Sequence, residues 1–357
     1  MNIRAGKIIY ERAEKLLKEL ISIPSLSGEE RVCADALSGY LLEKNVNVIR
    51  SGNNIIALSK SFDHGRKTLL LNSHIDTVAP SQGYTFDPFV PREDGDSIIG
   101  LGSNDAKASV VSLIETFLFF ENNDYLDFNL ILILSAEEEN SGERGVSLAL
   151  SGSPQIDCAI VGEPTGMKMA VAERGLIVVD GVAMGKSGHA ARGEGINAID
   201  IAIEDIMWLN NYNFAKKSPF TGEIRCTVTG INAGKQHNVI PDRCTFMIDI
   251  RTNELYSNEE IMETLSKNMK SELKARSLKH KSSSVPNDHH LVRCAESLGV
   301  DTFVSPTTSD WMRMNFPAVK MGPGDSSRSH SADEFILKEE LSEGIERYIE
   351  FISNLKL

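Results

Sequence analysis

Three short, continuous apolar runs separated by helix-like segments constrain the fold of this chain most strongly. The runs cover residues 68–71, 129–134 (NLILIL) and 158–161. Strands that are apolar on both faces are typical of parallel sheets covered by helices on each side. Helical spacing of apolar residues over 106–120 separates the first two runs, and a short helical stretch at 145–150 separates the second from the third. The sequence therefore predicts an α/β unit with a mostly parallel sheet flanked by helices.

A second pattern replaces the first after about residue 175. Long segments with period-two alternation predict strands, and helical spacing separates them. The expected strands cover 176–184, 224–231 and 246–250, with a last strand near 279–285, and the expected helices cover 197–209 and 258–276. This β-α-β-β-α order predicts a small α+β sandwich of ferredoxin-like type.

The α/β pattern returns after Pro286, so the second domain interrupts the first. Helices are expected over 288–298 and 338–354, with a strand at 318–321 between them. A chain of 357 residues is also too long for one typical domain and suits two. The predicted organisation is a discontinuous α/β domain of residues 1–175 and 286–357 with an inserted domain of residues 176–285.

The N-terminal segment predicts two helices and no targeting sequence. Apolar residues recur at helical spacing over 11–22, and Ser27 and Glu30 have the spacing of a capping box for a second helix. No apolar run resembles a signal peptide or reaches the ~20 residues of a membrane span. A net charge of −13 argues against nucleic acid, whose phosphates need a basic surface. Five scattered cysteines without a CxxC pair indicate a reduced, cytoplasmic compartment. We therefore expect neither a membrane nor nucleic acid as a partner.

Acidic and histidine residues follow the ends of the expected strands. They are His74, Asp76, the glutamates 137–139, Glu163 and His330, together with Asp105 at the start of the helix after a glycine-rich stretch. Ligands of parallel sheets bind outside the carboxyl ends of strands, so these groups are expected to converge on one crevice. Each residue taken alone is more often a solvated surface group, but their joint placement at strand ends favours a functional site.

The composition of this group suits two divalent metal ions. Two imidazoles among several carboxylates favour zinc, with manganese or cobalt able to substitute. A single carboxylate such as Asp105 can bridge two ions about 3.5–4 Å apart. In an extended His74-Ile75-Asp76 segment the first and third side chains point to the same face. Asp76 is therefore expected to accept the proton of the His74 nitrogen that does not bind metal, which fixes the ring.

The motifs that carry these residues resemble those of the di-zinc aminoacylase and carboxypeptidase family over essentially the whole chain. That family includes acetylornithine deacetylase, succinyl-diaminopimelate desuccinylase and glutamate carboxypeptidases. The matching segments are LLKELISIPSLSGEE, NSHIDTV, GLGSNDAK, SAEEENSGERG, VGEPT, GKSGHA, NVIPDRCTFMIDIRT, TTSDW and GPGDSSRSHSADE. The resemblance implies an amide hydrolase whose α/β domain holds two zinc ions, which cobalt can replace, and whose inserted domain serves as a lid and in dimerisation.

The resemblance also implies roles for individual residues. The implied ligands are His74 and Glu163 for one ion, Glu139 and His330 for the other, and Asp105 as the bridge. Glu138 would be the general base, and a shift of these roles by one residue along the glutamate triplet is the alternative. Asp76 completes the catalytic group, and the Asp105–Ala106 peptide bond is expected in the cis form.

Three further groups are expected from the inserted domain. His189 in GKSGHA is the family's candidate for stabilising the oxyanion, although the residues alone favour an ordinary loop histidine. Arg251 would pair with the α-carboxylate of the substrate, and the alternative is a surface salt bridge with Asp249. Asn238 is expected to assist in substrate binding.

A substrate class and an assembly follow from the same resemblance. In this family a glutamate at the position of Glu163 accompanies deacylases and carboxypeptidases, whereas aspartate accompanies aminopeptidases and dipeptidases. The segments ARGEGINAID and GPGDSSRSHSADEF look more like acetylornithine deacetylase than the diaminopimelate enzyme, so the expected substrate is N²-acetyl- or N²-succinyl-ornithine, which yields ornithine for arginine synthesis. Succinyl-diaminopimelate is the alternative substrate, and a non-catalytic binding paralogue is disfavoured because no ligand is missing. The resemblance implies a homodimer through the inserted domain, with His189 reaching the partner's active site.

Overall fold

The structure is a computed structural model that describes residues 6–123 and 126–357. The chain forms two compact units, and the second interrupts the sequence of the first. The first unit contains the residues up to Val171 with Val285–Phe303 and Ser309–Leu357, and the second contains Ala172–Ser284 with Val304–Thr308. Residues 1–5 of the N-terminal segment lie outside the described residues.

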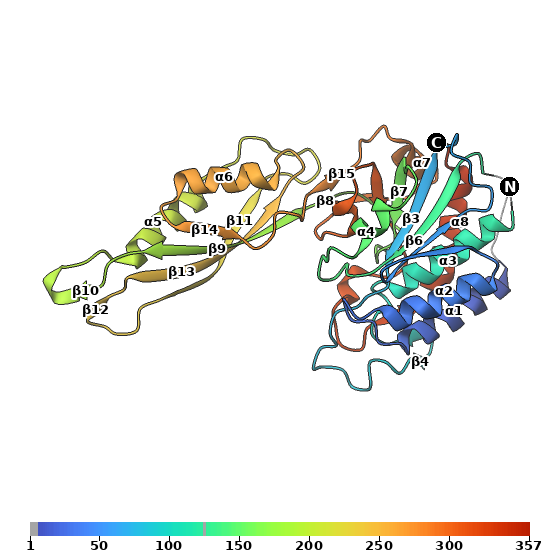
Figure 1. Cartoon of the computed structure of the whole chain (residues 1–357), viewed down its shortest axis with the longest axis horizontal. Coiled ribbons are helices and arrows are strands. Elements are labelled where there is room, and N and C mark those ends of the chain that lie inside the picture. The colour runs from blue at the N-terminus through green and yellow to red at the C-terminus, as the bar shows by residue number, and fades with distance from the viewer. Residues whose placement is uncertain (1–5, 124–125) are drawn as a thin grey trace. The chain divides into compact units, whose positions relative to one another are not determined.

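A central sheet forms the core of the first unit (Figure 1), and its residues 172–173, 283–284 and 304–305 fall in the ranges of the second unit. Within the described residues its strands follow the order β1-β2-β6-β3-β7-β17-β8-β15, and β16 pairs with β8. The four central strands, β6, β3, β7 and β17, are parallel, and antiparallel strands lie on both sides of them. The strands are β1 Val48–Ser51, β2 Asn54–Leu58, β3 Thr68–His74, β6 Asn129–Ser135, β7 Cys158–Val161, β8 Met169–Glu173, β15 Ser283–Ser284, β16 Thr302–Ser305 and β17 Ala318–Lys320.

Helices cover both faces of this sheet. The chain passes from β3 through α3 to β6 on one side of β3, and from β6 through α4 to β7 on its other side. Because such crossovers are right-handed, these opposite directions place α3 and α4 on opposite faces. Helices α1, α3 and α8 pack against one another. The helices of this unit are α1 Lys7–Ile21, α2 Arg31–Glu43, α3 Lys107–Glu121, α4 Val146–Ser151, α7 His290–Ser297 and α8 Lys338–Asn354, with 3₁₀ turns η2 Asp310–Arg313 and η3 Ser326–Arg328.

This architecture confirms the predicted α/β class with helices that flank a parallel core. Strands β3 and β6 are buried along their whole length, as their continuous apolar runs predict. A separate three-stranded sheet has the order β18-β5-β4 and combines segments that are distant in sequence. Its strands are β4 Arg92–Asp94, β5 Ser97–Ile99 and β18 Phe335–Leu337.

The strand register brings the carboxyl ends of β3, β6 and β7 to one edge of the sheet. His74 at the end of β3 pairs with Ser135 at the end of β6, and Asn72 pairs with Val161 at the end of β7. The chain reaches the two neighbours of β3 in opposite directions, so the carboxyl end of β3 is a topological switch point. Open α/β sheets bind their ligands at such points.

The second unit contains a four-stranded antiparallel sheet in the order β11-β13-β9-β14 (Figure 1). Helices α5 and α6 pack on it around buried Ile177, Val179, Phe246, Ile248 and Ile250. The chain order β-α-β-β-α-β with this strand order is that of a ferredoxin-like sandwich. The elements are β9 Gly175–Met184, β10 Gly188–His189, η1 Ala190–Arg192, α5 Ala198–Asn211, β11 Arg225–Ala233, β12 Val239–Ile240, β13 Arg243–Thr252, α6 Asn258–Asn268 and β14 Glu272–Ala275.

The prediction for the end of this sandwich is wrong in detail. The helix expected over 258–276 ends at Asn268, because the carboxylate of Asp205 accepts the backbone amides of Lys270 and Ser271, both at 2.8 Å. The chain therefore turns into an extended conformation early. The fourth strand is β14, and the expected strand near 279–285 is only the two-residue β15 of the other sheet.

The predicted capping box at the start of α2 does not form either. Glu30 is the N-cap of α2 without a side-chain cap, and its carboxylate accepts the amide of Gly28 at 2.5 Å. The hydroxyl of Ser27 donates instead to Oδ2 of Asp76 at 2.6 Å. The helix begins three residues later than a box at Ser27 requires, so Ser27 lies outside the cap, and its hydroxyl forms a charge-assisted hydrogen bond with the buried Asp76 carboxylate. The N-terminal segment is thereby attached to the end of β3.

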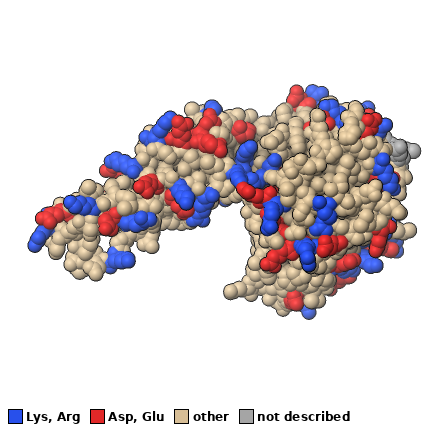
Figure 2. Space-filling model, viewed as in Figure 1, with Lys and Arg blue, Asp and Glu red and all other residues tan. Residues whose placement is uncertain are grey.

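Basic and acidic side chains are interspersed over the face that Figure 2 shows. No helix within residues 6–123 and 126–357 is both long and apolar enough to cross a membrane. All five cysteines are free thiols.

Candidate metal centre

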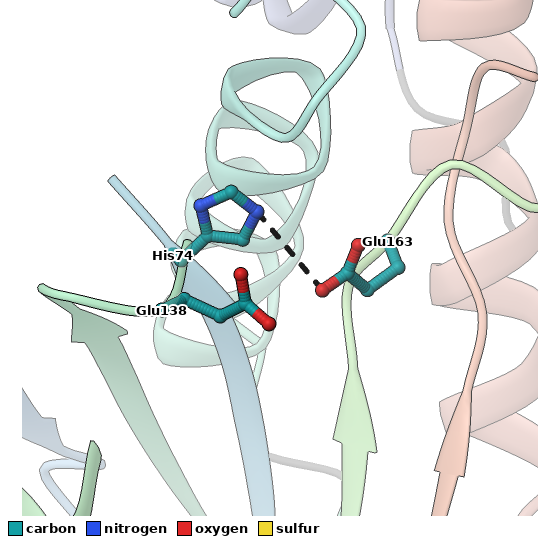
Figure 3. A group of neighbouring side chains, drawn as sticks. All are labelled: His74, Glu138 and Glu163. Atoms are coloured by element: carbon teal, nitrogen blue, oxygen red, sulfur yellow. Dashed lines mark ion pairs between the residues drawn. The ribbon is translucent and has the colours of Figure 1, made fainter. Parts of the chain in front are cut away.

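Side chains from three neighbouring strand ends converge at the carboxyl edge of the central sheet. His74 ends β3, Glu138 and Glu139 lie in the turn after β6, and Glu163 follows β7. Figure 3 shows His74, Glu138 and Glu163 around one small volume, with Nε2 of His74 4.0 Å from Oε1 of Glu163. In each of two groups, His74–Glu138–Glu163 and His74–Asp105–Glu139, the possible ligand atoms lie within 4.8 Å of one another.

Asp105 lies between the two histidines. Its Oδ1 is 3.2 Å from Nε2 of His74, and its Oδ2 is 3.8 Å from Nε2 of His330. His330 is also 3.0 Å from Oε2 of Glu139. The peptide bond before Ala106 is cis, as the resemblance implies. The cluster therefore has two adjoining halves that share Asp105, one with His74 and the other with Glu139 and His330.

Asp76 holds two parts of this cluster in place. Its fully buried carboxylate accepts the backbone amides of Glu138 at 3.1 Å and Glu139 at 3.0 Å. Nδ1 of His74 lies 3.4 Å from this carboxylate and 3.1 Å from the carbonyl oxygen of Asp76. The imidazole and the glutamate turn are thus positioned by one residue, and the backbone oxygen, which the sequence did not predict as a partner, is the closer acceptor.

The first glutamate of the triplet is held away from the cluster. Glu137 has a left-handed backbone with φ of 55°, and its amide donates to buried Glu30 at 3.1 Å. Its carboxylate accepts from Nε of Arg144 at 2.9 Å. Glu138 and Glu139 are therefore the two members of the triplet that reach the histidines.

Burial and crowding shift the titration of these groups. Burial raises the pKa of Glu138 well above its usual range and that of Glu163 to about 8. The hydrogen bond with Glu139 raises the pKa of His330 to about 9. Burial disfavours the ionised form of the two glutamates, and the neighbouring carboxylates add to the rise in pKa of all three groups.

The donor set fits a pair of divalent metal ions. Imidazole nitrogens and carboxylate oxygens are the ligands that zinc, cobalt and manganese accept. Four carboxylates and two imidazoles gather at this edge of the sheet, so bound cations would relieve the excess negative charge. Asp105 turns one oxygen toward each histidine, which suits a bridging carboxylate.

Two predicted site residues, His189 and Asn238, are neighbours in the second unit. His189 is exposed, and its Nδ1 accepts the amide of Ala191 at 3.2 Å. The carbonyl of Asn238 accepts the amide of Ala190 at 3.1 Å, and the short strands β10 and β12 pair beside them. The two side chains therefore share one loop region of this unit.

Arg251 also belongs to the second unit. Its Nε and a terminal nitrogen form a two-pronged ion pair with Asp249, at 2.8 and 3.0 Å. This is the salt bridge that the sequence leaves open as an alternative. Binding of a substrate carboxylate by Arg251 remains a prediction.

Three buried carboxylates beside the cluster have no role in the site assigned from the sequence. Glu30 accepts the amide of Glu137, Glu334 accepts amides of the loop that carries Asp105, and Asp310 accepts the hydroxyl of Ser135. Burial raises the pKa of Glu334 to about 7 and that of Asp310 to about 6. Glu334 and Asp310 lie within the motifs SHSADE and TTSDW, which is the only signal for them, because their partners are distant in sequence.

Comparison with known proteins identifies the class of enzyme that this fold and cluster define. Residues 70–354 match the model of peptidase family M20/M25/M40. The chain belongs to this family and is a hydrolase, and enzymes of the family are metal-dependent and typically dinuclear.

Three proteins of this family are similar to the chain over most of its length. The chain is 29% identical over 355 residues to the acetylornithine deacetylase of Salmonella typhimurium, covering 90% of this chain and 92% of that one. It is 28% identical over 267 residues to the succinyl-diaminopimelate desuccinylase of Sulfurimonas denitrificans, covering 71% and 72%. A dinuclear metal-binding peptidase of Bacillus subtilis has the same fold, with a TM-score of 0.72, 18% identity and coverage of 97% and 98%.

Proposed function

We propose that this enzyme removes the acyl group, acetyl or succinyl, from an N²-acyl-L-ornithine and releases ornithine. The observation that carries the proposal is the grouping of Glu138 with His74, Asp105, Glu139 and Glu163 at the switch point of the sheet. The match to acetylornithine deacetylase over 90% of the chain, and glutamate rather than aspartate at position 163, support this substrate class.

The proposed ligands are His74 and Glu163 for one ion, Glu139 and His330 for the other, and Asp105 between them. Zinc is the proposed metal, with cobalt able to replace it. Bound divalent ions supply Lewis-acid polarisation of the amide carbonyl and lower the pKa of the attacking water.

The chain's own residues then move the protons. Glu138 accepts the water proton on its carboxylate and returns it to the leaving amine. Asp76 keeps the amides of Glu138 and Glu139 fixed during these steps. His189, Arg251 and Asn238 are proposed to contact the oxyanion and the substrate carboxylate.

A substrate panel tests the proposal. With metal-loaded enzyme, kcat/KM for N²-acetyl- or N²-succinyl-ornithine should exceed that for succinyl-diaminopimelate by at least about ten-fold. The distal end of succinyl-diaminopimelate carries a carboxylate beside its ammonium group, whereas that of the acylornithine carries the ammonium group alone. Dipeptides with a free α-amine should be poorer still. Succinyl-diaminopimelate is the second candidate substrate, because the chain is similar to the Sulfurimonas desuccinylase. A clear preference for it would contradict the proposal that the substrate is an acylornithine. A preference for dipeptides would contradict the deacylase assignment altogether.

We further propose that the enzyme is a homodimer through the second unit. Strand β11 is an open edge of the four-stranded sheet, and α5 packs beside it. Ile203 and Met207 on α5 are exposed, as is Ile231 on β11. Open edges and exposed apolar side chains are usually covered, and pairing of two identical edges would do so with two-fold symmetry.

Mixing two inactive variants tests the proposed action of His189 on the partner subunit. If Glu138→Ala and His189→Ala proteins exchange subunits at random in equal amounts, half of the dimers are mixed. Each mixed dimer then holds one intact site, so about one quarter of all sites should be active under two-fold symmetry. No recovery of activity, despite exchange verified with differently labelled subunits, would show that His189 does not act across the dimer.

A further inference from the structure

We propose that Glu334 is a positioning residue that preorganises Asp105 for the two metal ions. Glu334 is 2% exposed, and its side chain contacts the loop that carries Asp105. The proposal deepens the proposed metal centre and rests on it, but it does not depend on which acyl amino acid the enzyme cleaves.

The carboxylate of Glu334 binds three backbone amides of this one loop. Oε1 accepts the amides of Asn104 at 2.8 Å and Asp105 at 2.7 Å, and Oε2 accepts the amide of Gly102 at 3.0 Å. The carbonyl oxygen of Glu334 also accepts the amide of Gly100 at 2.9 Å and the hydroxyl of Ser103 at 3.0 Å. A single residue therefore supplies the hydrogen-bond acceptors for most of the loop 100–105.

The strand pairing explains how a residue so distant in sequence reaches this loop. Strand β18 (Phe335–Leu337) pairs with β5 (Ser97–Ile99), with Phe335 opposite Ile99. The next position on each strand places Glu334 opposite Gly100, where the loop begins. The loop then turns at Gly102, which adopts a left-handed φ of 78° and donates its amide to the Glu334 carboxylate.

The same short segment carries another member of the cluster. His330 precedes Glu334 by four residues, and its Nε2 is 3.0 Å from Glu139. Residues 330–334 thus present one proposed ligand directly and hold the backbone of the bridging ligand. The segment thereby connects His330 with the backbone of Asp105, the residue that both halves share.

Removal of the Glu334 carboxylate should affect metal binding as well as the stability of the protein. An amide that loses its buried acceptor carries a desolvation cost, and the Glu334 side chain accepts three amides of this loop. Partners that orient a metal ligand typically change metal affinity by about 10–100-fold when they are removed. Without Glu334, Asp105 would have to be ordered by the metal ions themselves.

Cobalt titration of the metal-free full-length protein tests this inference. In Glu334→Gln the side chain keeps its size but has one acceptor oxygen where Glu334 has two, so at least one set of loop amides faces an NH₂ group. The affinity for at least one of the two Co²⁺ ions should fall by about 10–100-fold, measured by calorimetry. The visible absorption of the bound Co²⁺ should change as well, because the bridging carboxylate moves. Glu334→Asp, which keeps the charge on a shorter stem, should recover part of the affinity.

Glu115→Gln is the matched control. Glu115 is also a fully buried glutamate, but it binds Arg12 and Tyr40 between helices away from the cluster. This variant should lose thermal stability and still bind two Co²⁺ with the normal affinity and spectrum. Loss of Co²⁺ affinity to the same extent in both variants would mean that Glu334 acts only through general stability, and it would overturn the proposal.

Amide hydrogen exchange in the unsubstituted protein provides a test that needs no variant. In the metal-free protein the peptide that covers residues 100–106 should already be protected, because Glu334 binds its amides before any metal does. Exchange as fast as that of exposed loops would overturn the proposal. Failure of the unsubstituted protein to bind Co²⁺ would instead refute the metal centre itself, whereas normal Co²⁺ binding by folded Glu334→Gln would refute only the role of Glu334.

Discussion

Replacing Glu138 by glutamine should lower kcat by roughly 10²–10⁴-fold, which is the usual contribution of a general base. The substitution preserves the shape of the side chain and removes its ability to take a proton. Glu138 is not among the five proposed ligands, and its backbone amide would keep its bond to Asp76. Metal content should therefore stay near two ions per chain, and KM should change little. Steady-state kinetics combined with elemental analysis of the same preparation measures both quantities.

Glu139→Gln is the natural comparison, because it changes the adjacent residue in the same turn. Its carboxylate lies 3.0 Å from His330, so its loss should release one metal ion and lower activity through that loss. High concentrations of added metal should restore part of the activity of Glu139→Gln and none of that of Glu138→Gln. The reverse outcome would mean that the roles of base and ligand are shifted by one residue along the triplet.

Removal of the metal ions should abolish activity completely, and addition of zinc or cobalt should restore it. Amides are poor electrophiles and water is a poor nucleophile at neutral pH, so the reaction needs both the polarised carbonyl and the more acidic water that divalent ions supply. Dialysis against a chelator, followed by titration with each metal, measures the loss and the recovery. The titration should reach full activity at two equivalents per chain, whereas magnesium, which prefers all-oxygen sites, should restore little. Full activity in a preparation without bound metal would contradict the proposed mechanism.

The parallel core could be predicted because its signal is local and strong. The run NLILIL is apolar at every position except the first, which occurs where helices cover both faces of a strand. The sequence positions after such runs predict which side chains meet, since parallel strands end at one edge. His74, Glu139 and Glu163 meet there for this reason, and the register of β3 with β6 and β7 aligns them.

Other features depend on contacts between distant segments, which no local pattern reveals. The end of α6 is determined by Asp205, which lies 65 residues before Lys270, and not by the helical spacing of 258–276. Ser27 has the correct spacing for a capping box, but its hydroxyl donates to Asp76, and α2 begins only after Glu30. Glu334 binds amides about 230 residues earlier in the chain, so its role is visible only once β18 and β5 are known to pair.

The predicted site residues of the second unit differ from those of the cluster, because their proposed partners lie outside the chain. Their proposed partners are a substrate and a second subunit, so neither the sequence nor one chain contains the groups that they would contact. Arg251 illustrates the consequence, because it pairs with Asp249 in the chain alone. The notion that it exchanges this partner for a substrate carboxylate therefore rests on the family resemblance.

In the proposed arrangement, two metal ions flank Asp105. Anomalous X-ray scattering from crystals of the zinc-loaded enzyme, recorded on both sides of the zinc absorption edge, tests it most directly. We expect two peaks about 3.5–4 Å apart, the usual separation in two-metal sites. One should lie beside His74 and Glu163, and the other beside Glu139 and His330. A single peak in a fully active preparation, or peaks that do not flank Asp105, would contradict the account.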